Sequence, residues 1–235
     1  MISIVTGTLN RVNMLFQLVS NTVLADERIE LVLVDGGSTD GTIDYIKQLN
    51  HPQIKLIEVG ERSSYPHFMN LGIVNSKYEN VVQWNDDVIL CNEWKEVIKE
   101  LESDEDFYLF NWKYGSVQDT QNPEWLNGSD YTKGWCLCNN ASSGGEIVMN
   151  YGVYSKKIFR GIGMYSPDYR YYYADGDMAN RAYSFGYKVK DLHHIKVCSL
   201  PTNKVAVSYS EDKNIYENNL SLYRQRILPD CLQYL

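Results

Sequence analysis

Residues 29–46 read IELVLVDGGSTDGTIDYI, and this segment contains the unit from which the fold can be inferred. Six residues, mostly apolar, lead to Asp35, as expected for a buried strand. Glycine, serine and aspartate follow as turn formers, and from Thr42 onward apolar residues recur at helical spacing. A strand, a short turn and a helix in this order form the repeating unit of a parallel α/β sheet.

The same alternation extends on both sides of this unit. We expect strands over 2–6, 29–35, 54–59 and 80–84, separated by helices over 12–24, 42–49 and 68–77. A helix over 93–104 and a strand over 107–112 follow. The pattern βαβαβαβ predicts an α/β, Rossmann-like fold in which helices flank a mainly parallel central sheet.

The character of the sequence changes after residue 113. Residues 114–145 are rich in Gly, Asn, Ser, Asp and Trp without clear periodicity, so we expect a long functional loop that covers the site. Regular elements return over 146–200, and residues 214–228 have the pattern of a C-terminal helix.

Charge and cysteine content limit the class of protein. The 235 residues carry a formal net charge of −8 and no Lys/Arg cluster, which argues against a nucleic-acid partner. We find no apolar window of membrane-spanning length and no basic segment before a long apolar run, so we expect a cytoplasmic protein without a transmembrane segment. Five cysteines, an odd number, fit a reducing compartment, and Cys136-x-Cys138 lacks the second ligand pair of a zinc site.

Polar segments stand at the carboxyl ends of three of the expected strands. They are TGTLNR (6–11), DGGSTDGT (35–42) and NDD (85–87). Because carboxyl ends of parallel strands meet at one edge of a sheet, where ligands bind, we expect these segments to form one site. The first turn lacks G-x-G-x-x-G and the chain lacks G-x-x-x-x-G-K-[ST], which argues against a dehydrogenase and a P-loop NTPase.

Three carboxylates at these strand ends are candidates for ligand binding. Asp35 can accept hydrogen bonds from a nucleoside, although helix capping by residues 38–40 explains much of its turn without a ligand. Asp86 and Asp87 are hard oxygen ligands suited to Mg²⁺ or Mn²⁺, and the alternative for this pair is a surface turn.

A second group of candidates lies in and after YYYADGDMANRAYSFGYKV, residues 171–189. Asp175 and Asp177 open a helix, where an aspartate often serves only as a cap. Beside three tyrosines a carboxylate can instead be desolvated, which raises its pKa towards a value that suits a general base. His193 and His194 fall where a strand should begin, so at most one faces the site, as a metal ligand or as an ordinary core or surface residue.

Four segments together resemble, in order and spacing, the family 2 glycosyltransferases of GT-A fold: TGTLNR, ELVLVDGGSTDGT, YPHFMNLGIVNSKYENVVQWNDDV and YYYADGDMANRAYSFGYKV. The similarity covers about residues 1–195. It implies an inverting enzyme that moves a sugar from a nucleoside diphosphate donor (a UDP, dTDP or GDP sugar) to a glycan or other hydroxyl acceptor. It also implies dependence on Mn²⁺ or Mg²⁺ and a setting such as polysaccharide biosynthesis.

The resemblance assigns roles residue by residue. Nucleotide-sugar binding falls to Thr6, Thr8, Arg11, Asp35, Arg62, Asn70 and Asp86, metal binding to Asp87 with His194 as an added ligand, and general-base catalysis to Asp175. Where many relatives have Glu before the base and Arg before the asparagine, this chain has Ala174 and Met69, and Arg62 is a possible substitute for that arginine. Trp125 and Trp135 are candidate platforms for an acceptor sugar, and the alternative is that both pack the loop onto the core.

The resemblance also suggests a division of the chain. A GT-A domain over 1–200 would comprise a nucleotide-sugar half (1–113) and an acceptor half (114–200), followed by a helical extension over 201–235. The tyrosine-rich C-terminal helix is a candidate surface for a homo-oligomer. The alternative function is a non-catalytic glycan- or nucleotide-binding module on the same fold. A sugar-nucleotide nucleotidyltransferase is disfavoured, because no glycine-rich loop with Arg and Lys follows the first strand.

Overall fold

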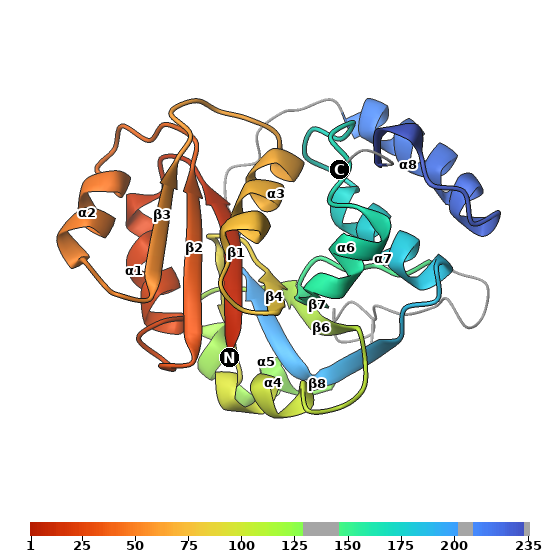
Figure 1. The fold of residues 1–235 in the computed structure, drawn as a ribbon. Helices are drawn as coiled ribbons and strands as arrows, with labels where there is room; N and C mark the ends of the chain where they lie inside the picture. The colour runs from red at the N-terminus through yellow and green to blue at the C-terminus, as the bar shows by residue number, and fades with distance from the viewer. Residues whose placement is uncertain (129–145, 202–208, 233–235) are drawn as a thin grey trace.

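The computed structural model describes residues 1–128, 146–201 and 209–232, which fold into a mixed α/β structure around one sheet (Figure 1). The sheet has eight strands in the order β3-β2-β1-β4-β7-β6-β8-β5. The strands are β1 (Ile2–Thr8), β2 (Ile29–Asp35), β3 (Ile54–Glu58), β4 (Asn80–Gln83), β5 (Val88–Leu90), β6 (Phe107–Tyr114), β7 (Gly152–Ser155) and β8 (Val189–Ser199). The helices are α1 (Val12–Asn21), α2 (Thr42–Leu49), α3 (Tyr65–Asn75), α4 (Trp94–Glu100), α5 (Pro123–Leu126), α6 (Lys156–Ile162), α7 (Ala174–Ser184) and α8 (Tyr209–Arg224), with 3₁₀ turns η1 (Asp119–Gln121) and η4 (Asp230–Leu232).

Strands β1 to β4 form the parallel half of the sheet. β1 pairs with β2 and β4, and β2 with β3, all in parallel and without a register shift. Successive residues of a strand face opposite sides, so Ile4 packs into one apolar layer and Val5 into the other. This arrangement confirms the α/β fold expected from the sequence and directs the carboxyl ends of these strands to one edge.

The remaining strands complete the sheet with mixed pairing. β7 is antiparallel to β4 and β6, β6 is parallel to β8, and the short β5 is antiparallel to β8. The Asp87 carbonyl accepts a hydrogen bond from the Leu200 N–H at 2.8 Å, just beyond the β5–β8 ladder. The segment that carries Asp86 and Asp87 is therefore fixed between β4 and β5.

Helices cover both faces of the sheet and form two apolar layers. One layer contains side chains of α1, α2 and α4, with the fully buried Trp84 in contact with Trp94 and Phe110. The other contains side chains of α3, α6, α7 and α8. Burial of apolar area at about 25 cal/mol per Å² is the main stabilising contribution of both layers.

Helix α8 lies beside α7 and completes the second layer (Figure 1). Its Tyr216, Leu220 and Tyr223 side chains are buried. These tyrosines are therefore used within the chain, and the predicted homo-oligomer contact through this helix would have to use its other faces.

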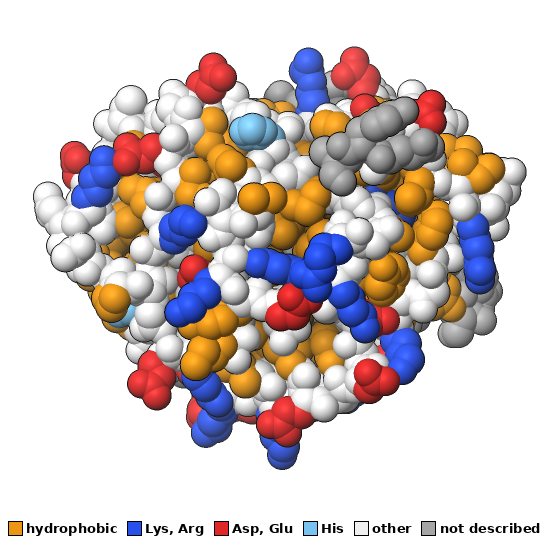
Figure 2. Space-filling model, in the orientation of Figure 1, with side chains coloured by type: hydrophobic (Ala, Val, Ile, Leu, Met, Phe, Trp, Pro, Cys, Tyr) orange, Lys and Arg blue, Asp and Glu red, His pale blue; other side chains and the backbone are white. Residues whose placement is uncertain are grey.

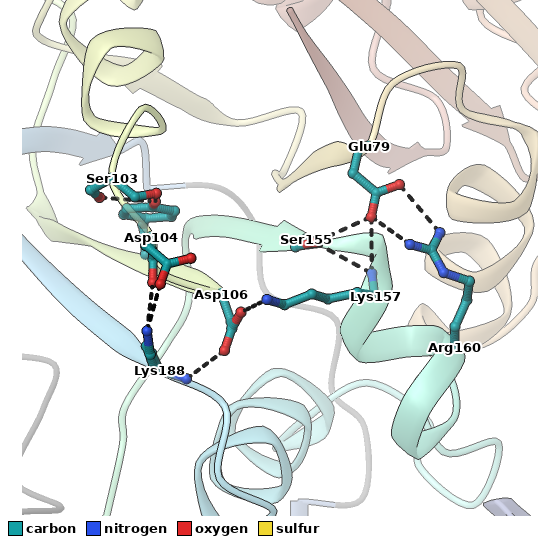
Figure 3. A network of polar contacts seen from close by, with 9 residues as sticks. Glu79, Ser103, Asp104, Asp106, Ser155, Lys157, Arg160 and Lys188 are labelled. Carbon is teal, nitrogen blue, oxygen red and sulfur yellow. Dashed lines mark hydrogen bonds and ion pairs between the residues drawn. The ribbon is translucent and has the colours of Figure 1, made fainter.

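A polar network joins α6 to the residues that precede β4 and β6 (Figure 3). This end of the sheet is opposite the polar carboxyl ends of the parallel strands. Glu79 accepts hydrogen bonds from Arg160 Nη2 and Nη1 at 2.7 and 3.2 Å and from the Lys157 N–H at 3.1 Å. Asp106 accepts one from the Lys188 N–H at 2.7 Å and forms an ion pair with Lys157. The hydrogen bond with Arg160 is the largest of the effects that lower the pKa of Glu79. The exposed Glu79–Arg160 pair contributes about 0–1 kcal/mol, so it orients α6 more than it stabilises the fold.

The surface mixes charges of both signs. On the face drawn in Figure 2, Lys and Arg side chains are interspersed with Asp and Glu and with apolar side chains. Among the helices of the described residues, none combines the length and the apolar character needed to cross a membrane.

Candidate active site

The carboxyl ends of β1 and β4 line a pocket of about 310 Å³, which we call the strand-end pocket. Its lining includes Thr8, Arg11, Arg62, Asp86 and Asp87. The Thr8 hydroxyl donates a hydrogen bond to Asp86 Oδ2 at 2.7 Å, although 78 residues separate them. Two of the three polar strand ends thus meet in this pocket.

The electrostatics of this pocket suit a cation bound together with an anionic group. Burial raises the pKa of the Asp86 carboxyl to about 6; the hydrogen bond from Thr8 opposes the rise, Asp87 adds to it and Arg11 opposes it. Adjacent carboxylates in a partly desolvated position attract a cation. Arg11 and Arg62 in the same lining can bind the anionic oxygens of a phosphate group.

The donor atoms fit a divalent ion that binds together with its substrate. Mg²⁺ and Mn²⁺ typically use one or two carboxylates and complete their shell with water and phosphate oxygens. Asp86 and Asp87 supply such carboxylates. Within residues 1–128, 146–201 and 209–232, no three His, Cys, Asp or Glu side chains are arranged to hold a metal ion. The residues present therefore fit a shared site completed by phosphate rather than a site formed by protein ligands alone.

Asp35 lies at the end of β2 but its carboxylate is engaged in its own turn. Oδ1 accepts hydrogen bonds from the N–H groups of Gly37 and Ser38 at 2.8 Å each, and Oδ2 accepts one from the Ser38 hydroxyl at 2.5 Å. Gly37 has a φ of 89°, and a Cβ there would lie 2.5 Å from the Gly60 carbonyl oxygen, so only glycine fits. These contacts explain the turn without a ligand, but the N-cap of α2 is Gly41 without a side-chain cap, so helix capping by residues 38–40 is not what the structure shows. The nucleoside contact of Asp35 stays a prediction.

Thr6 and Asn70 lie outside the lining of the strand-end pocket. Thr6 is buried, and its hydroxyl is 3.1 Å from the Gly7 carbonyl oxygen. The Asn70 amide donates to the Tyr165 carbonyl at 2.8 Å and accepts from the Tyr165 N–H at 2.9 Å. In this structure Asn70 therefore joins α3 to the segment before α7, whereas Arg62 lies in the pocket as expected.

A second cavity, of about 550 Å³, has both Asp87 and Asp175 in its lining, and we call it the central cavity. Asp175 lies in the first turn of α7. Burial raises the pKa of its carboxyl to about 6, and the hydrogen bond from the Gly176 N–H, at 2.8 Å, opposes that rise. A carboxylate with this pKa is ionised at neutral pH and basic enough to accept a proton from a hydroxyl group in the transition state.

Asp177 has a different environment, although it is only two residues further along α7. It is fully buried, and its Oδ1 accepts hydrogen bonds from the Tyr169 and Tyr223 hydroxyls at 2.8 and 2.7 Å and from Asn219 Nδ2 at 2.9 Å. Residues two apart on a helix point about 200° apart. Of the two aspartates that open this helix, Asp175 therefore faces the cavity and Asp177 joins α7 to α8.

His194 and Trp125 lie outside the linings of the strand-end pocket and the central cavity. His194 lies in the β8 segment where the register against β6 shifts, and its Nε2 is 3.3 Å from Glu100 Oε1 at the end of α4. The Trp125 ring lies 4.1 Å from Lys113 Nζ and packs so closely on Gly115 that a Cβ there would lie 2.5 Å from it. Trp125 thus corresponds to the packing alternative, and Trp135 lies outside the described residues.

Tyr171 is a site residue to which the sequence assigned no role. It lines the strand-end pocket and the central cavity, and the Arg62 guanidinium lies 5.2 Å from the centre of its ring. The three consecutive tyrosines of residues 171–173 could be seen in the sequence. Which of the three rings lines both the strand-end pocket and the central cavity depends on packing and could not be predicted. Tyr65 also lines both spaces and comes from the start of α3.

A model of the family described as glycosyl transferase family 2 matches residues 3–161. The chain belongs to this family. Similar solved structures include a mannosyltransferase from Pyrobaculum calidifontis in complex with GDP-Man and Mn²⁺, with 17% identity, a TM-score of 0.59, and coverage of 85% of this chain and 56% of that chain. Another is S. aureus TarS 1–349 in complex with UDP, with 16% identity, a TM-score of 0.66, and coverage of 96% and 66%.

These likenesses confirm the GT-A fold. The chain spans 56% of the length of the mannosyltransferase structure and 66% of the length of the TarS structure. Curated protein sequences give no significant match. The family match ends before α7, so neither Asp175 nor α8 lies within the matched residues.

Proposed function

We propose that this chain is an inverting glycosyltransferase that moves a sugar from a nucleoside diphosphate donor to a hydroxyl group of a glycan or other acceptor, with Mn²⁺ or Mg²⁺. The observation that carries the proposal is that Asp87 and Asp175 line the same central cavity. A donor held at Asp87 and an acceptor hydroxyl at Asp175 would meet in that space.

The strand-end pocket is the proposed donor site. Arg11 and Arg62 would bind diphosphate oxygens, and Asp87, with Asp86 nearby, would hold the divalent ion. The ion, when bound, neutralises charge on the departing diphosphate. Complexes of the two structural relatives with GDP-Man and Mn²⁺ and with UDP support this class of donor. UDP, GDP and dTDP sugars are all retained as candidates.

Asp175 is the proposed general base. It would take the proton of the acceptor hydroxyl as that oxygen attacks the anomeric carbon from the side opposite the diphosphate, which inverts the configuration in one step. Its raised pKa, caused by burial, makes it a stronger base than an exposed aspartate. Such a base typically contributes about 10²–10⁴-fold to the rate.

Nucleotide binding and turnover test this proposal separately. Thermal-shift measurements with UDP, GDP, dTDP and CDP, each with and without Mn²⁺, should show one nucleotide that stabilises the wild type more strongly with the ion. Release of that nucleotide from its sugar donor should then be lost in Asp175→Asn although binding remains. A protein that binds the nucleotide equally with and without Mn²⁺ would contradict the metal site.

The alternative is a non-catalytic binding module on the same fold. A module of this kind would bind nucleotide or glycan, show no turnover with any donor and acceptor pair, and bind equally well after Asp175→Asn. The raised pKa of the Asp175 carboxyl favours the enzyme, because a binding module gains nothing from a partly desolvated base.

A further inference from the structure

A third pocket, of about 270 Å³, also has Asp175 in its lining and is here called the tyrosine pocket. Asp175 and Asn150 line both this pocket and the central cavity. Other parts of its lining come from residues 146–150, from Tyr171 to Tyr173 and from Tyr216 of α8. A molecule in this pocket would therefore lie next to the proposed base, in a space whose lining does not include Asp86 or Asp87.

The walls of the tyrosine pocket are aromatic and come partly from α8. The rings of Tyr173 and Tyr216 are stacked, with their centres 5.0 Å apart and their planes at 23°. Because Tyr216 is buried and stacked on Tyr173, the aromatic surface on which the C–H groups of a sugar ring would pack comes from the half-buried Tyr171 to Tyr173. The lining and the size of the pocket fit one such ring.

A hydrogen-bonded chain forms the polar side of this pocket. The Tyr216 hydroxyl donates to Glu146 Oε2 at 3.0 Å and accepts from Asn180 Nδ2 at 3.0 Å. Asn180 also binds the backbone of Ile147 through both atoms of its amide, at 2.8 and 2.9 Å. Glu146 is thus held at the pocket by α7 and α8 together, with lone pairs left to accept hydrogen bonds from sugar hydroxyls.

The tyrosine segment itself is held by a carboxylate of α8. Asp212 is almost fully buried and accepts hydrogen bonds from the backbone N–H groups of Arg170, Tyr171 and Tyr172 at 3.0, 3.0 and 2.9 Å. The Arg170 carbonyl in turn accepts from the Tyr65 N–H at 2.8 Å. The pocket wall is therefore formed before any ligand binds, which lowers the entropic cost of binding.

The charge of this pocket is negative. Glu146 and Asp175 line it, Asp175 and Asp87 line the adjoining central cavity, and no Lys or Arg of the described residues lines either space. The strand-end pocket differs, because Arg11 and Arg62 line it. A ligand with a carboxylate or phosphate would be repelled in the tyrosine pocket, whereas a neutral ligand with hydroxyl groups would not.

We propose that the tyrosine pocket is the acceptor subsite, that it takes an uncharged sugar ring, and that Glu146 excludes anionic sugars. This inference rests on the proposed function, because the ring would present its hydroxyl to Asp175. It makes α8, which lies beyond the matched family residues, a functional part of the site.

Two probe sugars that share one ring, with a neutral CH2OH or an anionic carboxylate group at C6, test the proposal. Methyl β-glucopyranoside and methyl β-glucuronopyranoside share one ring, and their dissociation constants can be measured by ligand-observed NMR. We expect the neutral sugar to bind the wild type about ten-fold more tightly, since the carboxylates of the exposed Glu146 and the half-buried Asp175 both repel an anion. Glu146→Gln should reduce the ratio to about three-fold or less. Glu217→Gln, an exposed change on α8 that alters the net charge equally, should leave the ratio unchanged.

The outcomes separate this proposal from the proposed function. Equal affinity of both sugars for the wild type, or a ratio that Glu146→Gln does not change, would overturn the charge selectivity. If neither sugar binds while a nucleotide still stabilises the protein with Mn²⁺, the subsite assignment is wrong and the donor site stands. If the neutral sugar binds and no nucleotide does, the subsite stands and the transferase proposal is wrong.

Discussion

Replacing Asp175 by Asn should abolish turnover and at the same time stabilise the protein at neutral pH. Burial raises the pKa of this carboxyl from its ordinary value of 3.8 to about 6. At about 1.4 kcal/mol per pH unit, ionising it in the folded protein costs at most about 3 kcal/mol. Partial exposure of the side chain reduces this to about 1–3 kcal/mol. An asparagine has no charge to desolvate and can still accept the hydrogen bond from the Gly176 N–H.

The sign of the pH dependence follows from proton binding. Between pH 3.8 and about 6 the folded protein holds the Asp175 proton more tightly than the unfolded chain does. The free energy of unfolding therefore falls as pH rises through this interval. The gain of Asp175→Asn over the wild type should be near zero at pH 4 and reach its full value above about pH 6.5. Because Asp86 titrates in both proteins, the difference between them isolates Asp175.

Urea denaturation at several pH values measures this difference, and Asp177→Asn is the matched control. Asp177, on the same helix, accepts three hydrogen bonds in the core, so this change should lower the free energy of unfolding by about 1–3 kcal/mol. Turnover of the wild type should rise with pH to a plateau above about pH 6, and Asp175→Asn should lower it about 10²–10⁴-fold. An Asp175→Asn protein that is less stable than the wild type at pH 7.5 would refute the desolvation argument.

Three further predictions concern the surroundings of the site. Asp87→Ala should remove the Mn²⁺-dependent part of the thermal shift with nucleotide and leave the shift without Mn²⁺ unchanged; an intact Mn²⁺ effect would place the ion elsewhere. Asp212→Ala should lower the free energy of unfolding by about 2–4 kcal/mol, because three backbone N–H groups lose a carboxylate acceptor, and should speed hydrogen exchange over 170–172; unchanged exchange there would contradict the contact. His194→Ala should leave the Mn²⁺ titration unchanged, since this side chain pairs with Glu100, and a weaker Mn²⁺ effect would restore it as a ligand.

The sequence predicted the parallel half of the fold well because its signals are local. β2 and α2 begin and end at the expected residues, since the apolar run, the glycine turn and the helical spacing all lie within 29–49. The three-residue strand β5 has no such signal and exists only through its pairing with β8. The C-terminal helix begins at Tyr209 rather than near residue 214, and its close packing on α7 was not visible in its own pattern.

Strand topology also explains which site residues could be predicted. Thr8, Arg11, Asp86 and Asp87 follow strand ends and meet in the strand-end pocket, as parallel pairing requires. Asn70 was assigned by its place in a motif, and the structure uses its amide to hold the Tyr165 backbone. The partner of such an amide lies 95 residues away in the chain, so no local pattern identifies it.

Asp175 and Asp177 show what a sequence can and cannot decide at such a site. Helical geometry alone requires that two aspartates two positions apart point in different directions. Which of them faces the cavity is set by α8, because Asn219 and Tyr223 supply donors to Asp177 in the core. With Oδ1 of Asp177 accepting three hydrogen bonds in the core, Asp175 is the aspartate left in the lining of both the central cavity and the tyrosine pocket. Helix α8 thus has three roles: it engages Asp177, it holds the tyrosine segment through Asp212, and it forms one side of the proposed acceptor subsite through Tyr216. Removing α8 should therefore disable the site even where the family-matched residues remain folded.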